Sequence, residues 1–356
     1  MTSVLLLGAG GSASANVLDA LRRADTEYRV VGADADARNL HLSAADERIV
    51  IPRADHPQYA DVLIDAIQTY RCDVLHAQPD PDVRAIGALR DTLPARTFLP
   101  TQDVLDLAAD KLAFARAMGA AGVGTPESID YPDDESAVVD VTRELLTRHE
   151  RVWVRARRGA GARASLPVRT AEQALAWIRW WVDERDLSIG DFMAAEMLPG
   201  REFAYQSVWQ DGELVAGQAR ERVVYLYGFL TPSGQTSTPQ IARTVREAAV
   251  DELAHAAVRA LDPYPNGVFC VDVKEAASGT PMVTEINAGR FFTTSNFFAA
   301  AGLNMPDLAM RCAMGERPAR LPTSPLAPDL YWIRMVDMGY ALVPGDELDA
   351  WPRPGR

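Results

Sequence analysis

The first hundred residues alternate short apolar runs with helical patterns, and this alternation limits the folds open to the chain. The apolar runs lie at residues 4–7, 29–32, 48–51, 73–76 and 96–99, and the helical patterns lie at 16–24, 59–70 and 83–92. Strands that alternate with helices usually pair in parallel, because each crossover helix returns the chain to the same edge. We therefore expect an α/β domain with an open parallel sheet over residues 1–108.

The remaining chain reads as α+β. A helical pattern at 110–122 precedes strand patterns at 152–155 and 164–168, a helix at 170–184 and strands at 192–198, 202–209 and 214–224. A polar loop at 231–239 then leads into a long helix that ends near Leu261, two strands flank Ser278-Gly279, and another strand pattern lies at 329–335. These patterns indicate that the regular alternation of the first domain gives way to a mixture of strands and helices in the rest of the chain.

Composition excludes several classes of partner. The chain has 356 residues with 36 basic and 49 acidic side chains, a formal net charge of −13. Such a negative charge opposes binding to nucleic acids or anionic membranes. No apolar run approaches the length of a membrane helix, and the apolar start lacks the basic flank of a signal peptide, so we expect a cytoplasmic protein. The three cysteines are far apart and the five histidines lack metal-binding spacing, which argues against disulfide or zinc frameworks.

A glycine-rich turn at residues 8–11 follows the first strand, and Asp34 ends the second. This arrangement approaches the dinucleotide-binding fingerprint, in which a helix N-terminus holds a pyrophosphate and an acid holds the ribose. Ala13 replaces the third glycine, so a tight turn without a ligand explains the pattern equally well.

Residues 151–163 contain five arginines and no acid. Gly159 and Gly161 let the backbone approach a ligand closely, and the arginines supply charge-assisted donors. The pattern favours a polyphosphate site, with an exposed basic hairpin as the alternative.

The segment 269–290 carries the strongest chemical signal. A two-residue turn at Ser278-Gly279 places Asp272 opposite Glu285, and alternation puts Asn287 on the same face. Opposed carboxylates repel, and a bound cation relieves the repulsion. These hard oxygen ligands suit Mg²⁺ or Mn²⁺. A register slipped by one residue would leave only a solvent-facing acidic pair.

Other polar residues near these segments are candidates for ligand binding. Arg290 follows the metal strand, and Glu196 and Glu202 flank a Pro-Gly turn, where they could also be ordinary strand-edge acids. Arg220 and Arg222 share a strand face and could bind an anionic substrate or be surface charges. The run Thr293, Thr294, Ser295 and Asn296 could bind a substrate carboxylate or simply cap a helix.

Taken in order, these segments resemble the ATP-grasp superfamily, over about residues 1–315. The resemblance rests on DKLAFARAMGAAGVGTPES (110–128), VWVRARRGAGARAS (152–165), AAEMLPGREF (194–203) and VDVKEAASGTPMVTEINAGR (271–290). It implies an N-terminal open-sheet domain followed by two α+β subdomains that grip ATP, a small one at 109–190 and a larger one with the metal site at 191–320, and then a C-terminal extension at 321–356. It also implies an acyl-phosphate intermediate made from a carboxylate. The arginine at position 155 is similar to the residue at this position in the large subunit of carbamoyl-phosphate synthase and in its small-molecule ligase relatives.

The resemblance also assigns roles residue by residue. It implies phosphate contacts from Lys111, Arg155, Gly159, Gly161 and Arg163, adenine contacts from Glu196, Met197 and Leu198, a ribose contact from Glu202, magnesium ligation by Asp272, Glu285 and Asn287, and stabilisation of the transferred phosphoryl group by Arg290. Lys111, Arg155 and Arg290 are the implied catalytic residues. The family often has an Asn-Pro-Arg step here, whereas this chain has Asn287-Ala288-Gly289-Arg290, so the extra residue could displace Arg290.

The expected function is an ATP- and Mg²⁺-dependent (or Mn²⁺-dependent) ligase that joins a small-molecule carboxylate to an amine, with a homodimer as the default oligomeric state. Three alternatives stay open. They are an enzyme that phosphorylates bicarbonate or carbamate, an NAD-dependent oxidoreductase that uses the N-terminal glycine turn, and a non-catalytic ATP-binding module.

Overall fold

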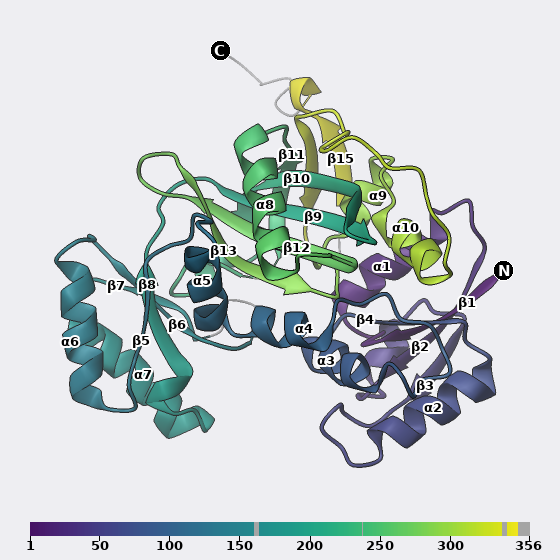
Figure 1. Ribbon diagram of the computed structural model, residues 1–356, viewed down its shortest axis with the longest axis horizontal. Helices are drawn as coiled ribbons and strands as arrows, with labels where there is room; N and C mark the ends of the chain where they lie inside the picture. Colours follow the sequence, from purple (N-terminus) through teal and green to yellow (C-terminus); the bar gives the residue numbers. More distant parts are fainter. Residues whose placement is uncertain (160–163, 237, 337–339, 348–356) are drawn as a thin grey trace, which may run out of the picture.

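Three β-sheets form the framework of the protein. The computed structural model describes residues 1–159, 164–236, 238–336 and 340–347. A parallel N-terminal sheet lies at one end, a large antiparallel sheet in the middle and a small antiparallel sheet at the other end (Figure 1). The mixture of a parallel sheet with two antiparallel sheets confirms the predicted fold class.

The N-terminal sheet has four parallel strands in the order β3-β2-β1-β4. Its elements are β1 (Thr2–Leu7), α1 (Ser12–Arg22), β2 (Tyr28–Asp34), a 3₁₀ turn η1 (Asn39–Leu42), β3 (Glu47–Val50), α2 (Tyr59–Tyr70), β4 (Val74–Ala77) and α3 (Asp80–Leu89). The fifth strand predicted at 96–99 is wrong. Arg96 makes only an isolated bridge to Val74, because the following Pro100 and α4 turn the chain away from the sheet.

The helix predicted at 110–122 is confirmed as α5 (Lys111–Ala120). A further helix that the sequence patterns missed, α4 (Gln102–Ala109), precedes it, and Asp110 lies between the two. The Asp110 carboxylate accepts hydrogen bonds from the backbone N–H groups of Leu112 and Ala113, both at 3.1 Å, and so caps α5. This cap places Lys111 at the first position of the helix.

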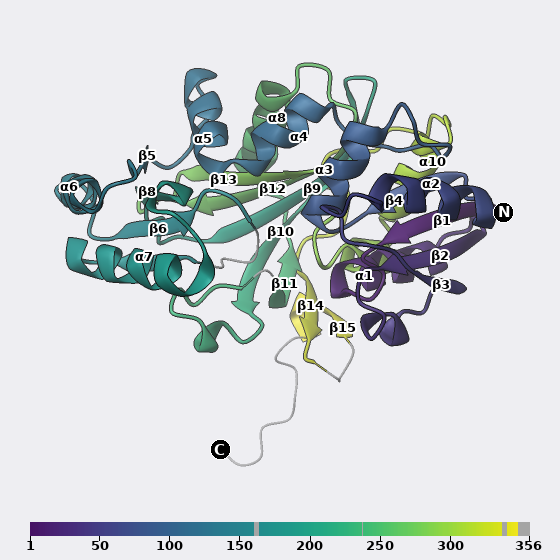
Figure 2. The same ribbon diagram turned by 90° about the horizontal axis from the view of Figure 1, so that it is seen from below.

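The small sheet has the order β5-β8-β6-β7. It contains β5 (Ser128–Asp130), α6 (Glu135–Leu146), β6 (Val152–Ala156), β7 (Leu166–Val168), α7 (Ala171–Arg185), η2 (Ile189–Asp191) and β8 (Phe192–Glu196). Helices α6 and α7 pack on each other and on one face of this sheet (Figure 2). Because β8 pairs with β6 over its full length, it lies in the small sheet, beyond the boundary predicted at residue 190.

The large sheet has seven antiparallel strands in the order β13-β12-β9-β10-β11-β14-β15. It contains β9 (Glu202–Gln210), β10 (Glu213–Tyr225), η3 (Gly228–Leu230), β11 (Pro239–Thr244), α8 (Ala248–Leu261), β12 (Gly267–Glu275), β13 (Pro281–Ala288), α9 (Asn296–Ala300), α10 (Met305–Ala313), β14 (Leu330–Arg334), β15 (Tyr340–Pro344) and η4 (Gly345–Glu347). Sequence patterns missed β11, which lies where loop and helix were expected. Strands β14 and β15 show that the segment after 321 joins this sheet.

The β12–β13 hairpin places Asp272 opposite Glu285, as predicted, but by a different route. Residues 277–279 form the turn, with Gly279 at φ +82° and the Ala276 N–H bonded to the Thr280 carbonyl. The longer turn shifts the register by one residue, and a bulge at Thr284 shifts it back. Asp272 and Glu285 therefore face each other only because the two irregularities compensate.

Apolar packing joins the N-terminal sheet to the large sheet. One buried cluster runs from Leu5 and Leu63 through Phe114 to Tyr205 and Phe269, whereas the small sheet has its own cluster around Ile178. Across the described part of the chain, no helix is both long enough and apolar enough to span a membrane.

Candidate active site

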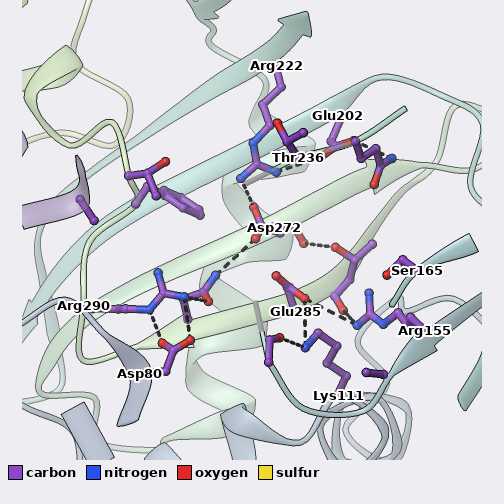
Figure 3. A pocket seen from close by; sticks show the side chains of 18 of the residues that line it. Asp80, Lys111, Arg155, Ser165, Glu202, Arg222, Thr236, Asp272, Glu285 and Arg290 are labelled. Atoms are coloured by element: carbon purple, nitrogen blue, oxygen red, sulfur yellow. Dashed lines mark hydrogen bonds and ion pairs between the residues drawn. The ribbon is translucent and has the colours of Figure 1, made fainter. Parts of the chain in front are cut away.

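A cavity of about 490 Å³ opens where the three sheets meet. Its wall comes from the ends of β4 and α3, from α5, from β6 and from the face of the large sheet turned away from α8 (Figure 3). The charged residues in the described wall are four acids, Asp80, Glu202, Asp272 and Glu285, and four bases, Lys111, Arg155, Arg222 and Arg290. Buried charges of both signs at this density indicate a binding or catalytic site.

The predicted metal ligands lie together in this wall. Asp272 and Glu285 are paired across β12 and β13, and the Asn287 amide nitrogen lies 3.3 Å from Oδ2 of Asp272. Burial and the Glu285 charge raise the pKa of Asp272. Burial also acts on Glu285, but the charges of Lys111 and Arg155 outweigh it and lower the pKa of that carboxyl.

Two carboxylates and an amide oxygen form a hard-oxygen donor set, which fits Mg²⁺ or Mn²⁺ held partly by phosphate and water. The described residues contain no cluster of three or more His, Cys, Asp or Glu side chains that would hold a metal without such help. The donor set therefore suits a metal that arrives with its substrate.

Lys111 and Arg155 approach Glu285 from the opposite wall. Their nitrogens lie 3.9 Å and 3.7 Å from Oε2 of Glu285, too far for short hydrogen bonds. Arg155 also donates to the Thr284 carbonyl at 3.0 Å, so the bulge residue helps to orient it. Burial lowers the pKa of both cations despite the nearby Glu285 charge. An anionic ligand between these cations and the metal ligands would recover part of that desolvation cost.

Arg222 connects two of the acids. It lies 2.9 Å from Glu202 and 2.5 Å from Asp272, while Lys274 lies 3.3 Å from Glu202. The Tyr225 hydroxyl donates a further hydrogen bond to Glu202. Burial opposes charge on Glu202, but Arg222 and Lys274 outweigh it and lower the pKa of the carboxyl. The network keeps Glu202 ionised at the junction of two pockets.

Arg290 reaches the cavity despite the extra residue before it. Its guanidinium donates to Oδ1 of Asn287 at 2.6 Å and forms an ion pair with Asp80, at the N-terminus of α3 (Figure 3). Gly289 makes this path possible, because it adopts φ +81° and packs closely against Val83, Leu99 and Leu105. Burial opposes the charge on Arg290, but Asp80 outweighs it and raises the pKa of the guanidinium.

A second, smaller pocket continues from the cavity toward β5 and β8. Its wall combines Glu196, at the end of β8, and the following Met197 and Leu198 with apolar side chains such as Ala115 and Met193. Lys111, Arg155 and Glu202 line both pockets. A small, partly apolar pocket next to a cation-lined cavity suits a nucleotide, with its base in the pocket and its phosphates between the cations.

The arginine-rich stretch only partly meets the cavity. Arg155 and Gly159 line it, and the Lys111 ammonium donates to the Gly159 carbonyl. Arg157 and Arg158 instead pair with Asp110 at 2.8 Å and 3.4 Å, and Arg151 lies 4.0 Å from Glu150. The expectation of five arginines gathered on phosphate is thus wrong for these three, because acids outside the stretch neutralise them. Gly161 and Arg163 lie outside the described residues.

The predicted substrate residues separate into two groups. Arg222 and Thr293 line the cavity. Arg220 is buried beneath it, where burial and the Arg222 charge lower the pKa of its guanidinium to about 9. It donates to Thr294 and lies 5.2 Å from the Phe292 ring. Ser295 and Asn296 are also buried, and Asn296 donates to Asp19 on α1 at 3.0 Å. Thr294, Ser295 and Asn296 therefore pack the cavity floor against the N-terminal domain.

The glycine turn at residues 8–11 is closed by its own chain. The Asp34 carboxylate accepts hydrogen bonds from the N–H groups of Gly10 at 3.0 Å and Asp36 at 2.9 Å. A Cβ at Gly10 would lie 2.5 Å from the Asn39 backbone. The acid that a dinucleotide site needs for ribose is thus engaged in the turn, which does not support the oxidoreductase alternative.

Sequence reasoning missed Asp80, Trp153, Tyr225 and Thr284, which also line the cavity. Asp80 follows the strand β4 through Pro79, so its position at the carboxyl end of a parallel strand was a readable signal. The others lacked one, because their places depend on how the sheets pack.

Comparison with solved structures shows what the chain is similar to. The biotin carboxylase domain of 2-oxoglutarate carboxylase from Hydrogenobacter thermophilus matches with TM-score 0.68 and 15% identity, over 92% of this chain and 73% of the other. The L-amino acid ligase from Bacillus licheniformis matches with TM-score 0.65 and 14% identity, over 93% and 79%. The N5-carboxyaminoimidazole synthetase from Staphylococcus aureus, complexed with ADP, matches with TM-score 0.66 and 16% identity, over 93% and 81%.

No protein-family model matches the sequence, and no curated protein matches it by sequence. At these identities the structural likeness concerns the fold. The fold common to these enzymes is the ATP-grasp fold, so the predicted fold is confirmed over most of the chain.

Proposed function

We propose that the protein is an ATP- and Mg²⁺-dependent ligase that activates a small-molecule carboxylate as an acyl phosphate and transfers the acyl group to an amine, releasing ADP. One observation supports this most directly. The opposed pair Asp272 and Glu285, with Asn287, faces Lys111 and Arg155 across a cavity that continues into the pocket at Glu196. The likeness in fold to a biotin carboxylase domain and to an L-amino acid ligase also supports the proposal.

In this proposal each residue has a defined task. Met197 and Leu198 contact the adenine with their backbone, and Glu196 accepts a hydrogen bond from its amino group. Glu202 binds the ribose, and Lys111, Arg155 and Gly159 bind the phosphates. Arg290 stabilises the transferred phosphoryl group and holds the substrate carboxylate beside it. Positioning and electrostatic stabilisation supply most of the catalysis in phosphoryl transfer. Burial of the cavity walls also shields a labile acyl phosphate from water.

Asp272, Glu285 and Asn287 would hold Mg²⁺, which would supply charge neutralisation on the phosphate oxygens. The chain's own cations complete that neutralisation from the other side. The cytoplasmic location stays a prediction. The homodimeric state also stays a prediction, and the biotin carboxylase domain of similar fold is itself a dimer.

A second candidate is an enzyme that phosphorylates bicarbonate. It is favoured by the likeness to a biotin carboxylase domain solved with bicarbonate and MgADP. The two candidates share the nucleotide and metal sites and differ in the carboxylate bound at Arg290. They are separated by measuring which substrate, an organic carboxylate or bicarbonate, stimulates the release of ADP from Mg·ATP.

The direct test measures ADP, AMP and phosphate release from Mg·ATP across a panel of carboxylates, bicarbonate included, each with and without a panel of amines. We expect ADP release that requires both a carboxylate and an amine. AMP formation would contradict an acyl-phosphate route. Release driven by bicarbonate without any other carboxylate would favour the second candidate.

Asp272→Asn and Glu285→Gln should each lower kcat by about 100-fold or more, because each removes a charged metal ligand. Both variants should also weaken Mn²⁺ binding, measured by paramagnetic relaxation of water. Glu275→Gln is the matched control, since Glu275 lies on the same strand but pairs with Arg201 at 2.7 Å outside the cavity wall. Full activity in Asp272→Asn or Glu285→Gln would refute the metal assignment.

A further inference from the structure

The cavity has an end that a nucleotide and its metal would not fill. Beyond Arg290 the wall passes to the N-terminal domain, where Ala13, Gln78, Pro79 and Asp80 line it, next to Thr293 from the segment between β13 and α9. The adenine pocket lies at the other end, next to β5 and β8. If the proposed function holds, the N-terminal end is where the second substrate approaches the activated carboxylate.

Asp80 is the one acid in the described wall without a task in nucleotide or metal binding. Glu202 is held by Arg222 and Lys274, and Asp272 and Glu285 face the metal position. Asp80 lines the cavity and its side chain is 45% exposed, whereas the Arg290 side chain is only 10% exposed. Its carboxylate is therefore open to a ligand at the place where the second substrate would arrive.

The partner of Asp80 changes when the carboxylate substrate binds. Arg290 is the cation that pairs with Asp80, and it also contacts Asn287 beside the metal position. A substrate carboxylate on Arg290 competes with Asp80 for the same guanidinium donors. Asp80 then needs a new cation, because an unpaired carboxylate in a half-buried wall costs free energy.

Two neutral acceptors line the same cavity as Asp80. The side-chain amide oxygen of Gln78 is buried and has no hydrogen-bond partner among the described residues, and Thr293 contributes a hydroxyl to the wall. A carboxylate and an amide oxygen together form a good site for an ammonium group, which carries three N–H donors.

We infer that Asp80 binds the ammonium group of the amine substrate, and that this substrate is a protonated alkylamine such as an amino acid. This inference rests on the proposed ligase function. Neutral nitrogen nucleophiles and bicarbonate have no positive charge to offer Asp80. The inference therefore selects amide formation with an alkylamine over carboxylation of a neutral nitrogen.

The covalent step balances with this placement. The bound ammonium loses one proton to water, and its lone pair then attacks the acyl carbon. The C–N bond forms as the C–O bond to phosphate breaks, and the bonding pair leaves with the phosphate. The nitrogen loses its second proton to that phosphate, which departs as hydrogen phosphate.

The test compares two nucleophiles on the full-length protein. Each carboxylate of the panel is offered with Mg·ATP and either alkylamines, namely the common amino acids and their amides, or hydroxylamine, which is neutral at pH 7 and traps acyl phosphates as hydroxamates. Asp80→Asn keeps an oxygen that Arg290 can bond but removes the negative charge. We expect it to lower kcat/KM for the alkylamine about 10- to 100-fold, mainly through KM. Hydroxamate formation should change less than about 3-fold.

Asp82→Asn is the matched control. Asp82 lies in the same first turn of α3, but it accepts a hydrogen bond from Tyr59 at 2.6 Å and does not line the cavity. It should leave both reactions within about 2-fold. Asp80→Glu should restore part of the alkylamine reaction.

Three results would overturn the inference. An equal loss with both nucleophiles in Asp80→Asn would mean that Asp80 acts only by positioning Arg290. An equal loss in Asp82→Asn would assign the effect to the helix as a whole. Wild-type hydroxamate formation with no use of any alkylamine would exclude the substrate class. Absence of hydroxamate with every carboxylate would instead count against the proposed function itself.

Discussion

Single buried carboxylates in this protein differ in the charges that surround them. Burial alone would raise the pKa of each, but Lys111 and Arg155 reverse that effect at Glu285. Asp251, on α8, has acids for neighbours instead. Burial, with the charges of Glu247 and Glu252, raises its pKa to about 6, although Ser324 donates a hydrogen bond to it at 2.9 Å. The surroundings of Asp251 in the folded state therefore disfavour its ionised form.

Asp251→Asn should make the protein less sensitive to rising pH. Because the folded-state pKa of Asp251 lies above the unfolded value, the contribution of its neutral carboxyl to stability is complete at low pH and is lost as the pH rises from about 4 through 6. The variant avoids this loss, which amounts to about 3 kcal/mol at most. Urea unfolding at pH 4.5 and pH 7.5 measures the difference. An advantage of the variant that does not grow with pH would contradict the prediction.

At the scale of elements, the β12–β13 hairpin combines two irregularities that sequence patterns did not show. The turn is one residue longer than expected, and the bulge at Thr284 compensates for it. The Thr284 carbonyl in this bulge also accepts a hydrogen bond from Arg155. The hairpin ends at Gly289, whose positive φ directs Arg290 toward Asp80. The irregular positions therefore place the charged groups of the cavity.

Gly289→Ala and Gly279→Ala separate backbone strain from packing. Both glycines have φ near +80°, but a Cβ at Gly289 would lie 2.8 Å from Val83, whereas a Cβ at Gly279 meets nothing within 4 Å. We expect Gly279→Ala to cost about 1 kcal/mol of unfolding free energy and Gly289→Ala about 2 kcal/mol or more. Chemical denaturation measures both, and equal costs would show that packing at Gly289 is unimportant.

The described residues of the whole molecule form two units of apolar packing that differ in extent. The N-terminal and large sheets share two buried clusters, and the small sheet has a separate one. A small fourth cluster, Leu112 with Met193 and Ala195, connects α5 to the small sheet. We expect the small sheet to open independently of the rest, as a clamp over a nucleotide requires.

Ile178→Ala tests this independence. Ile178 is fully buried in the small-sheet cluster, so the truncation should cost about 2–5 kcal/mol there. Hydrogen exchange should accelerate in β5–β8 and stay unchanged in β1–β4. Leu63→Ala, equally buried in the larger cluster, should produce the opposite pattern. Faster exchange in both units with either variant would show that they unfold together.

Sequence alone determined the features that depend on local periodicity and spacing. Alternation of apolar runs predicted the parallel sheet, and the spacing of the β12–β13 hairpin predicted that Asp272 lies opposite Glu285, although the turn and the bulge that produce this register were not predicted. Such features are readable because side-chain direction follows from the repeat of a strand or helix.

Only the tertiary structure decided which charges meet. It paired Arg157 and Arg158 with Asp110, and it brought Asp80 to Arg290 from 210 residues away. It also added β11 to the large sheet and made Asp34 part of the turn at Gly10. These contacts join segments distant in sequence, so no local pattern records them. Burial then determines how far the pKa of each charged group shifts, because desolvation depends on everything packed around that group.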